Sequence, residues 1–302
     1  MTKSTLLVLV NWNSFEFTDQ CLVSLSYCNQ SLFDVVVVDN GSNDGSGEQL
    51  KKQHPEIILI PSLSNLGFAG GNNLGIKYAI EQQYTYVMLL NNDTFVEPDF
   101  LDVLVDYMNQ HPEAGVIQSK IYFNHNRKLL WNAGSYFNRW ITLPVTLGYM
   151  RTDKPKYNSI KEVDWITGCA FFARTDVIKQ SGMLNEKFFI YFEDVDLSFR
   201  IKKLGYQLIY HPKSVVYHIS GMSNKSKTKQ KEGYVHPYVR YLNQRNRIWF
   251  VKKYIHPYFI LPTIFYHTLY SLAVMVYFLL RGRFKKLSAF LQGTKEGILD
   301  SL

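Results

Sequence analysis

The stretches LLVLVNWN at residues 6–13 and VVVVDNGS at residues 35–42 decide the fold class. Each is a short, uninterrupted apolar run that ends in polar residues, and a segment of helical periodicity lies between them. Further apolar runs follow at Ile57–Ile60 and Tyr86–Leu90, with a helical segment near Gly71–Gln83 between them. Apolar runs that alternate with helices are typical of a parallel sheet buried on both faces. We therefore predict an α/β fold with a mostly parallel sheet, flanked by helices.

Polar residues end three of these runs, namely Asn11, Asp39 and the segment Asn91–Asp93. Open α/β sheets bind ligands at the carboxyl ends of their strands, so these residues are expected to share one edge of the sheet. A carboxylate such as Asp39 can accept the ring N–H of a pyrimidine base, and Asp93 can hold a hard divalent cation through oxygen. A plain turn explains either stretch when it is taken alone.

A glycine-rich segment, NLGFAGGNNLG at residues 65–75, precedes and opens the helical stretch. Its glycines let the backbone approach a ligand closely, and a helix N-terminus favours anions. It lacks both the strand-then-GxGxxG order of a dinucleotide-binding fingerprint and the Gly-Lys-Ser/Thr ending of a P-loop. A structural glycine loop and a phosphate site are equally compatible with this segment.

Three acids, Glu193, Asp194 and Asp196, follow a dense aromatic cluster in FFIYFEDVDL, residues 188–197, where a helix is predicted to begin. Acids are favoured in a first helical turn, but capping needs only one carboxylate. Aromatic surroundings raise the pKa of a carboxyl group, which makes it a better general base, and they offer a face to a sugar ring. We therefore favour a catalytic role for Asp194 and leave capping and function equally open for Glu193.

The charge of the chain is unevenly distributed. Residues 1–150 carry 8 Lys and Arg against 14 Asp and Glu, whereas residues 151–302 carry 25 against 11. An evenly basic nucleic-acid-binding protein would not show this asymmetry, and basic charge at one end indicates an anionic bilayer surface. The three cysteines form no Cys-x-x-Cys pair, which argues against a disulfide scaffold or a zinc ribbon.

The C-terminal part has the character of a membrane-binding region. Residues 258–280 contain no charged side chain and form a run long enough to cross a bilayer. Pro262, His267 and four tyrosines interrupt this apolar run. A single crossing would place the basic residues 281–286 opposite a cytosolic domain, against the positive-inside tendency. We expect an interfacial or re-entrant segment instead, with a spanning helix, a buried hairpin or a dimer contact as alternatives. The apolar residues expected to face the lipid in the following tail are Phe284, Leu287, Phe290 and Leu291.

In this order, the segments resemble the inverting glycosyltransferases of family two, which have the GT-A fold, and most closely the bacterial rhamnosyltransferase-like branch. The resemblance covers about Leu6 to Arg247. It is carried by residues 10–13, 39–42, 65–75 and 91–93, by Gly168 with Phe171-Phe172, by residues 188–196, by His218 and by Arg245-Asn246.

The resemblance implies a catalytic domain at residues 1–235. The basic and apolar pattern of residues 236–302 predicts a helical membrane-associating region on the cytoplasmic face of the cell membrane. It implies that the acceptor hydroxyl, on a glycan or a lipid-linked molecule, attacks the anomeric carbon of a nucleotide-diphosphate sugar with inversion, in the synthesis of a cell-surface polysaccharide. The branch suggests dTDP-L-rhamnose as donor, with galactofuranose and other hexoses open.

The resemblance also implies residue roles. Asp194 would be the catalytic base, and Glu193 would orient the acceptor or the base. Asp93 would bind Mg²⁺ or Mn²⁺ on the diphosphate, with His218 as a second ligand. The residues expected to bind the nucleotide sugar are Asn11, Asp39, Asn65, Gly67, Gly71, Asn72, Asn91 and Asn92, and those expected to bind the acceptor are Trp165 and Tyr191. Trp165 and His218, taken alone, are more typical of structural residues.

The chain departs from the family pattern at two positions. Asn91 stands where the metal signature often has its first Asp, and Asn72 where many relatives carry a basic residue. A nucleotidyltransferase is the nearest alternative enzyme, but it would carry a Gly-rich loop with Arg and Lys where this chain reads Asn11–Ser14. A non-catalytic carbohydrate-binding or scaffold protein explains the aromatic residues but not the combination of Asp93, Asp194 and His218.

Overall fold

The computed structural model describes residues 3–220, 235–300 and 302. The Lys, Glu, Ser, Asn and Thr residues within 221–233 predict a loop there, and this segment lies outside the described residues. The chain divides into two compact units. The first unit comprises, of the described residues, 3–136, 146–189 and 193–220, and the second comprises 137–145, 190–192, 235–300 and 302. The domain boundary predicted at residue 235 remains a prediction.

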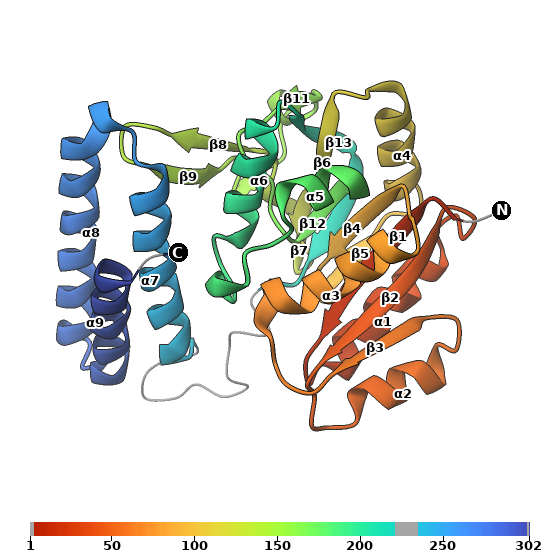
Figure 1. The fold of residues 1–302 in the computed structure, drawn as a ribbon, viewed down its shortest axis with the longest axis horizontal. Helices are drawn as coiled ribbons and strands as arrows, with labels where there is room; N and C mark the ends of the chain where they lie inside the picture. Colours follow the sequence, from red (N-terminus) through yellow and green to blue (C-terminus); the bar gives the residue numbers. More distant parts are fainter. Residues whose placement is uncertain (1–2, 221–234, 301) are drawn as a thin grey trace. The chain divides into compact units, whose positions relative to one another are not determined.

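The first unit is built on one large sheet (Figure 1). Its parallel strands lie in the order β3 (Ile58–Ser62), β2 (Phe33–Asn40), β1 (Thr5–Asn11) and β4 (Tyr86–Leu90). The sheet continues through β12 (Ala170–Arg174), β6 (Ala114–Phe123), β7 (Asn126–Asn132) and β10 (Arg151–Thr152), while β13 (Gln207–His218) pairs with β6, β5 (Thr94–Val96) and β11 (Lys161–Glu162). The predicted α/β class is confirmed.

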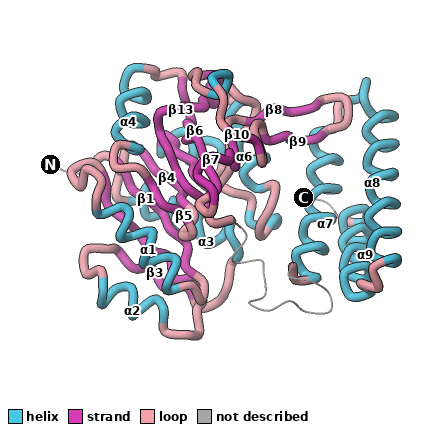
Figure 2. Tube along the Cα trace, turned by 180° about the vertical axis from the view of Figure 1, so that it is seen from behind, coloured by secondary structure: helices cyan, strands magenta, loops and turns pink. Residues whose placement is uncertain are grey.

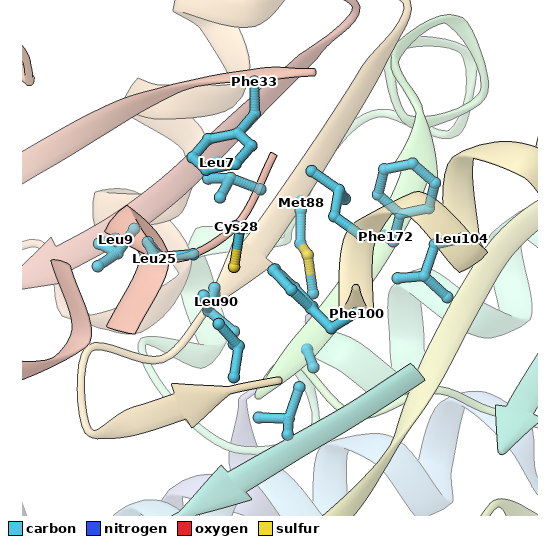
Figure 3. Close-up of a cluster of buried hydrophobic side chains, with 14 of the residues drawn as sticks. Leu7, Leu9, Leu25, Cys28, Phe33, Met88, Leu90, Phe100, Leu104 and Phe172 are labelled. Atoms are coloured by element: carbon cyan, nitrogen blue, oxygen red, sulfur yellow. The ribbon is translucent and has the colours of Figure 1, made fainter. Parts of the chain in front are cut away.

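Helices cover both faces of this sheet, because side chains alternate along each buried strand. Leu7 and Leu9 of β1 share one buried cluster with residues from α1 (Phe15–Ser26), α2 (Ser46–Gln53) and α4 (Phe100–Gln110) (Figures 2 and 3). Leu6 and Val8 share the other with residues from α3 (Gly67–Glu81), α5 (Thr175–Ser181) and α6 (Glu193–Lys203). A strand apolar on both faces therefore sits at the centre of the unit.

The apolar pattern of Val163–Ala173 predicts one strand, but only Ala170–Ala173 of this stretch belongs to β12. The backbone N–H groups of Ile166, Thr167 and Gly168 bind side chains instead of a neighbouring strand. The N–H of Ile166 donates to Ser198 Oγ, that of Thr167 to Gln118 Oε1, and that of Gly168 to Asp194 Oδ2. The sequence shows the apolar pattern of this stretch but not these competing partners.

Helix α3 begins at Gly67, earlier than the predicted start near Gly71, so most of the glycine-rich segment is helical. Gly67 has a φ of +72°, and a Cβ there would lie 2.5 Å from a ring carbon of Phe189. Within the helix, a Cβ on Gly75 would lie 2.3 Å from Val8. Gly75 lets α3 lie directly on β1, and Gly67 leaves room for Phe189, which gives part of the motif a structural reason.

The second unit contains α7 (Pro237–Tyr254), α8 (Ile260–Leu280) and α9 (Phe284–Leu299), together with the tip of the hairpin formed by β8 (Ser135–Asn138) and β9 (Leu143–Thr146). Helix α9 packs so closely on α7 at Gly293 that a side chain has no room there. A Cβ on Gly293 would lie 2.4 Å from the Tyr241 carbonyl oxygen. Of the predicted lipid-facing stripe of the tail, Phe290 is buried in this unit, whereas Phe284 and Leu291 are exposed.

One helical segment of the described residues, Pro257–Leu280, is long and apolar enough to cross a membrane, with a mean hydropathy of 1.6 over its most apolar window. Only 6% of that window is buried. A core helix of a water-soluble protein would be mostly buried, so the exposure of this one favours an apolar environment outside the chain.

Candidate active site

A network of hydrogen bonds joins the carboxyl ends of β1 and β2. The pairing of these strands places Asn11 beside Asp39, and Asn11 Nδ2 donates to Asp39 Oδ1 over 3.1 Å. The same amide donates to Ser46 Oγ, and Ser42 Oγ donates to Asp39 Oδ1. Among the described residues, no hydrogen bond reaches Asp39 Oδ2. The network thus fixes one oxygen of Asp39 and leaves the other for a ligand N–H.

The network extends to the end of β4 through α1. Thr18 Oγ1 donates to Asn11 Oδ1 over 2.9 Å and accepts from Asn92 Nδ2 over 2.8 Å. Asn91 lies at the same strand end, where its Nδ2 is 3.4 Å from Nε2 of His218. The structure therefore brings Asn11, Asp39, Asn91 and Asn92 together at one edge, as the strand pattern predicted.

Asp93 and His218 form a buried pair at the same edge. His218 ends β13 and Asp93 immediately precedes β5, and pairing of these strands places Asp93 Oδ1 3.0 Å from His218 Nε2. Burial lowers the pKa of His218, but Cys169 and the Asp93 carboxylate raise it, to about 10. Burial raises the pKa of Cys169 itself, so its thiol is neutral at pH 7 and the Asp93 charge holds the imidazolium.

The pair is a suitable but incomplete set of metal ligands. Asp93 supplies a hard oxygen 3.0 Å from His218 Nε2, and this nitrogen can act as a ligand only when a metal ion displaces its proton. No group of three or more His, Cys, Asp or Glu residues that could hold a metal occurs within residues 3–220 and 235–300. Mg²⁺ is commonly held by one or two protein ligands together with substrate phosphates and water. The residues therefore fit a divalent cation that binds with a diphosphate.

Asp194 is held rigidly beside the end of β4. Its Oδ2 accepts the Gly168 N–H over 2.9 Å, and its Oδ1 accepts the Val195 N–H over 2.8 Å. The carbonyl of Cys169, the residue after Gly168, accepts the N–H of Asn91 over 3.0 Å. Burial raises the pKa of Asp194, although these N–H groups oppose the shift. The carboxylate is thus oriented and more basic than an ordinary aspartate.

Glu193 differs from Asp194 in its surroundings. The side chain is buried, and Oε2 has no hydrogen-bond partner among the described residues. Burial raises the pKa of Glu193 well above its usual range, and the charge of Asp194 raises it further. Two acids with raised pKa values side by side are typical of a catalytic site, where one proton is shared between them.

The third acid of the trio, Asp196, is part of the core. It is fully buried, and its Oδ2 accepts from Arg200 Nε over 2.9 Å. Arg200 also donates to the carbonyl oxygens of Ser181 and Met183, which ties α6 to the end of α5. The structure therefore gives Asp196 a role in packing that differs from the roles of Glu193 and Asp194.

We expect Asp196→Ala to lower stability by about 3–5 kcal/mol, because it leaves the Arg200 guanidinium without its counter-charge. The melting temperature measures this loss. The kcat per folded molecule, measured well below the melting transition, should stay close to that of the unaltered chain. A stable variant with a large loss of kcat would instead assign Asp196 to catalysis.

Several residues predicted to bind the nucleotide sugar have clear structural partners. Asn65 Oδ1 accepts from the Gly67 N–H over 2.8 Å and from Asn40 Nδ2 over 3.2 Å. Asn72 is buried and donates to the Phe68 carbonyl oxygen within α3. Together with the close approach of Gly71 to Val10, these contacts set the start of α3. A role in binding remains a prediction for Asn65, Gly67, Gly71 and Asn72.

The two predicted acceptor-binding residues lie in different surroundings. Trp165 is only 8% exposed, and its Nε1 donates to the Tyr136 carbonyl oxygen. Tyr191 belongs to the second unit, where its carbonyl oxygen and that of Ile190 accept from Asn246 Nδ2. Acceptor binding remains a prediction for both, and Trp165 offers little free surface for it.

The backbone before the acids is strained. Phe189, Tyr191 and Phe192 have φ values of 65°, 75° and 71°, a region that residues other than glycine seldom adopt. Such outliers persist only where surrounding contacts hold them, and they cluster at functional sites. The strain precedes Glu193 directly in the chain.

Sequence reasoning missed the residues that support this site. Thr18 and Ser46 bond to Asn11 at the end of β1, but each is a common helix residue with no distinctive spacing. The partners of the Asp194 carboxylate are backbone N–H groups, which no sequence motif reports.

Comparison with known proteins adds to this geometry. The family model described as "Glycosyl transferase family 2" matches residues 7–180. An N-acetylglucosaminyl-diphospho-decaprenol L-rhamnosyltransferase of Mycobacterium tuberculosis is 27% identical over 237 residues, which cover 72% of this chain and 76% of that protein.

Two solved structures are similar in fold. GalNAc-T7 with UDP, GalNAc and Mn²⁺ matches with a TM-score of 0.58 and 15% identity, and the match covers 82% of this chain and about half, 51%, of that one. The mannosyltransferase PcManGT from Pyrobaculum calidifontis, with GDP-Man and Mn²⁺, matches with a TM-score of 0.57 and 15% identity over 100% of this chain and 77% of that one.

Proposed function

Because the chain belongs to glycosyltransferase family 2, we propose that it transfers a sugar from a nucleotide-diphosphate donor to a hydroxyl group of a glycan or lipid-linked acceptor, with inversion at the anomeric carbon. The product is part of a cell-surface polysaccharide. The similarity to an L-rhamnosyltransferase supports dTDP-L-rhamnose as the first donor to test.

The observation that carries this proposal is the Asp194 carboxylate. It is oriented by two backbone N–H groups, its pKa is raised, and it lies beside the end of β4, at the edge of the sheet that also carries Asp39 and Asp93. A fixed carboxylate with a raised pKa suits a general base that takes a proton from a hydroxyl group. Glu193, buried beside it, orients the acceptor or shares the proton.

The sugar is transferred in a single displacement, without a covalent intermediate. The acceptor oxygen forms a bond to the anomeric carbon as the bond from that carbon to the phosphate oxygen breaks. The hydroxyl proton passes to Asp194, and the nucleoside diphosphate leaves with the bonding electrons. Asp39 would accept an N–H of the base through its open oxygen, with Asn11 holding the carboxylate in place.

Asp93 and His218 would hold Mg²⁺ or Mn²⁺, with Asn91 beside them. Such a cation would neutralise the charge that builds up on the leaving diphosphate. Because Asn91 replaces an acid, the protein contributes one negative charge fewer, and the donor's own phosphates become the more important ligands.

A panel of nucleotide sugars tests the proposal directly. The donors are dTDP-L-rhamnose, UDP-galactofuranose, UDP-glucose and GDP-mannose, first by thermal stabilisation and then by turnover with acceptor. From a nucleotide sugar, a glycosyltransferase releases the nucleoside diphosphate, whereas transfer of the nucleotidyl group releases the sugar 1-phosphate. A carbohydrate-binding protein without activity would release neither, so the identity of the released product separates the three functions.

We also propose that the second unit holds the enzyme on the cytoplasmic face of a membrane without a simple crossing. The exposed apolar surface of Pro257–Leu280 and the basic residues on either side of it support membrane contact. A relative that acts on a decaprenol-linked substrate supports a lipid-linked acceptor for this chain.

Topology in vesicles tests this proposal. We expect a tag after Leu302 to be cut by protease in inside-out vesicles and protected in right-side-out vesicles, since residues 281–286 then stay on the cytoplasmic side. The reverse pattern would establish a true crossing. A full-length chain that stays wholly in the soluble fraction would contradict membrane association in either form.

A further inference from the structure

A cavity of about 390 Å³ lies within the second unit, among α7, α8 and α9. One wall is a single face of α7, since its residues recur at helical spacing. Its polar members are Arg240, Asn243, Gln244 and Arg247. The opposite wall comes from α8, and Phe290 of α9 also lines the space.

Among the residues that the structure describes, none supplies a counter-charge to Arg247 in this cavity. Arg247 is 9% exposed, and its Nε donates to Nδ1 of His267 over 2.9 Å. The other ring nitrogen of His267 lies 2.8 Å from the Ile141 carbonyl oxygen, to which it must donate, so the imidazole is neutral. The guanidinium stacks on Tyr270, with 3.5 Å between its carbon and the ring centroid. Nη2 is buried and has no hydrogen-bond partner among the described residues.

Arg240 lies two helical turns earlier on the same face, and its buried Nε also has no partner in the described part of the chain. The carboxylate side chains in the described part of this unit are Glu296 and Asp300, and neither lines the cavity. Glu296 accepts hydrogen bonds from Tyr241 Oη and Gln292 Nε2. Two cations with unused N–H groups in one cavity, which no described acid lines, create a site for an anion.

The rest of the lining is apolar or aromatic. It includes Leu143, Val274 and Phe278 beside the tyrosines of α8. Helix α8 also exposes a large apolar surface, with Phe265 67% accessible. An inorganic anion would match the arginines only, whereas a phosphate on a long hydrocarbon chain matches both parts of the lining.

We propose that this cavity binds the phosphate group of a lipid phosphate, with Arg240 and Arg247 on the phosphate oxygens and the hydrocarbon chain along the apolar lining. The proposal rests on the proposed function, for which it locates the lipid part of the acceptor. Phe192 lines the cavity, and the next residue in the chain is Glu193. The phosphate could come from the lipid-linked acceptor or from a bulk anionic phospholipid, and the experiment separates these sources.

Farnesyl phosphate is the probe, titrated into the full-length chain in neutral detergent, with binding measured calorimetrically. We expect it to bind at least ~10-fold more tightly than farnesol or inorganic phosphate, because only it satisfies both the arginines and the apolar wall. Inorganic phosphate binding as tightly as farnesyl phosphate would overturn the lipid part of the proposal, and no binding of either would overturn all of it.

Arg240→Gln with Arg247→Gln should weaken binding of farnesyl phosphate by at least ~10-fold. The matched control removes two exposed positive charges of the same unit, Arg281→Gln with Lys285→Gln, and should change binding by less than about twofold. Val274→Trp fills the cavity without a change of charge and should also abolish binding, which keeps the test valid if the double arginine variant fails to fold. Undiminished binding in folded arginine and Val274 variants would overturn the proposal.

Competition by vesicles identifies the source of the phosphate. Displacement of farnesyl phosphate by phosphatidylglycerol vesicles, but not by phosphatidylcholine vesicles, assigns the cavity to a bulk anionic lipid. Retention in the presence of both assigns it to the acceptor. Because binding is measured without donor, it can succeed when no glycosyl transfer is found, and transfer to a soluble glycan can succeed when no lipid phosphate binds. The two proposals therefore fail separately.

Discussion

Asp194→Asn is expected to lower kcat by roughly 10²–10⁴ while binding of the nucleotide sugar persists, because the amide keeps the shape of the carboxylate but cannot take a proton. Asn can still accept one backbone N–H through its carbonyl oxygen, so the contact with Gly168 or Val195 survives in part. Turnover is measured as nucleoside diphosphate released, and binding as the thermal shift caused by the donor.

The pH profile gives a second measure of the same role. The base acts in its deprotonated form, and burial raises the pKa of Asp194. The kcat should therefore fall as the pH drops through that raised pKa, above the range of an ordinary aspartate, and the variant should lose this acidic limb. A limb at the ordinary aspartate range would contradict the assignment.

Asp176→Asn is the matched control. Asp176 lies in the first turn of α5, and its Oδ1 accepts the N–H of the next residue over 2.8 Å, as Asp194 does in α6. If the carboxylate of Asp194 only stabilised the start of its helix, the two variants would show similar small effects on stability and normal kcat. Near-normal turnover in Asp194→Asn would return that residue to a capping role.

The sequence could predict which strand ends lie together at the site. The apolar runs predicted the strands, and their polar ends predicted that Asn11, Asp39 and Asn91–Asp93 would lie together, because parallel strands end at one edge.

The spacing of the acids Glu193, Asp194 and Asp196 could not separate their roles. Arg200 pairs with Asp196 from one helical turn away, yet only the packing of α6 on α5 decides that this pair is buried.

The glycine-rich segment was ambiguous for a related reason. A glycine that lets backbone approach a ligand and one that lets a helix approach a sheet have the same sequence signature. In the structure, Gly71 and Gly75 face Val10 and Val8 of β1, and Gly67 faces Phe189. Such contacts join residues far apart in the chain, so no local pattern predicts them.

Turnover is expected to require a divalent cation held largely by Asp93. Asp93→Ala should lower kcat/KM by about 10² or more and raise the Mg²⁺ or Mn²⁺ concentration needed for half-maximal activity. The physical reason is that Asp93 is the acid at this strand end closest to His218, with Asn91 contributing no charge. A metal titration at saturating donor measures the effect.

Asp99→Ala is the control, because Asp99 is an exposed acid only six residues further along the chain. Its loss should change neither the metal requirement nor kcat. Asp93→Asn supplies a second variant that keeps a side chain beside His218 and removes only the charge, so a folding defect in the alanine variant does not prevent the test. Full activity in excess EDTA would show that the cation is dispensable. A cation requirement unaltered in both Asp93 variants would place the metal on other ligands and leave Asp93 as the buried partner of His218 alone.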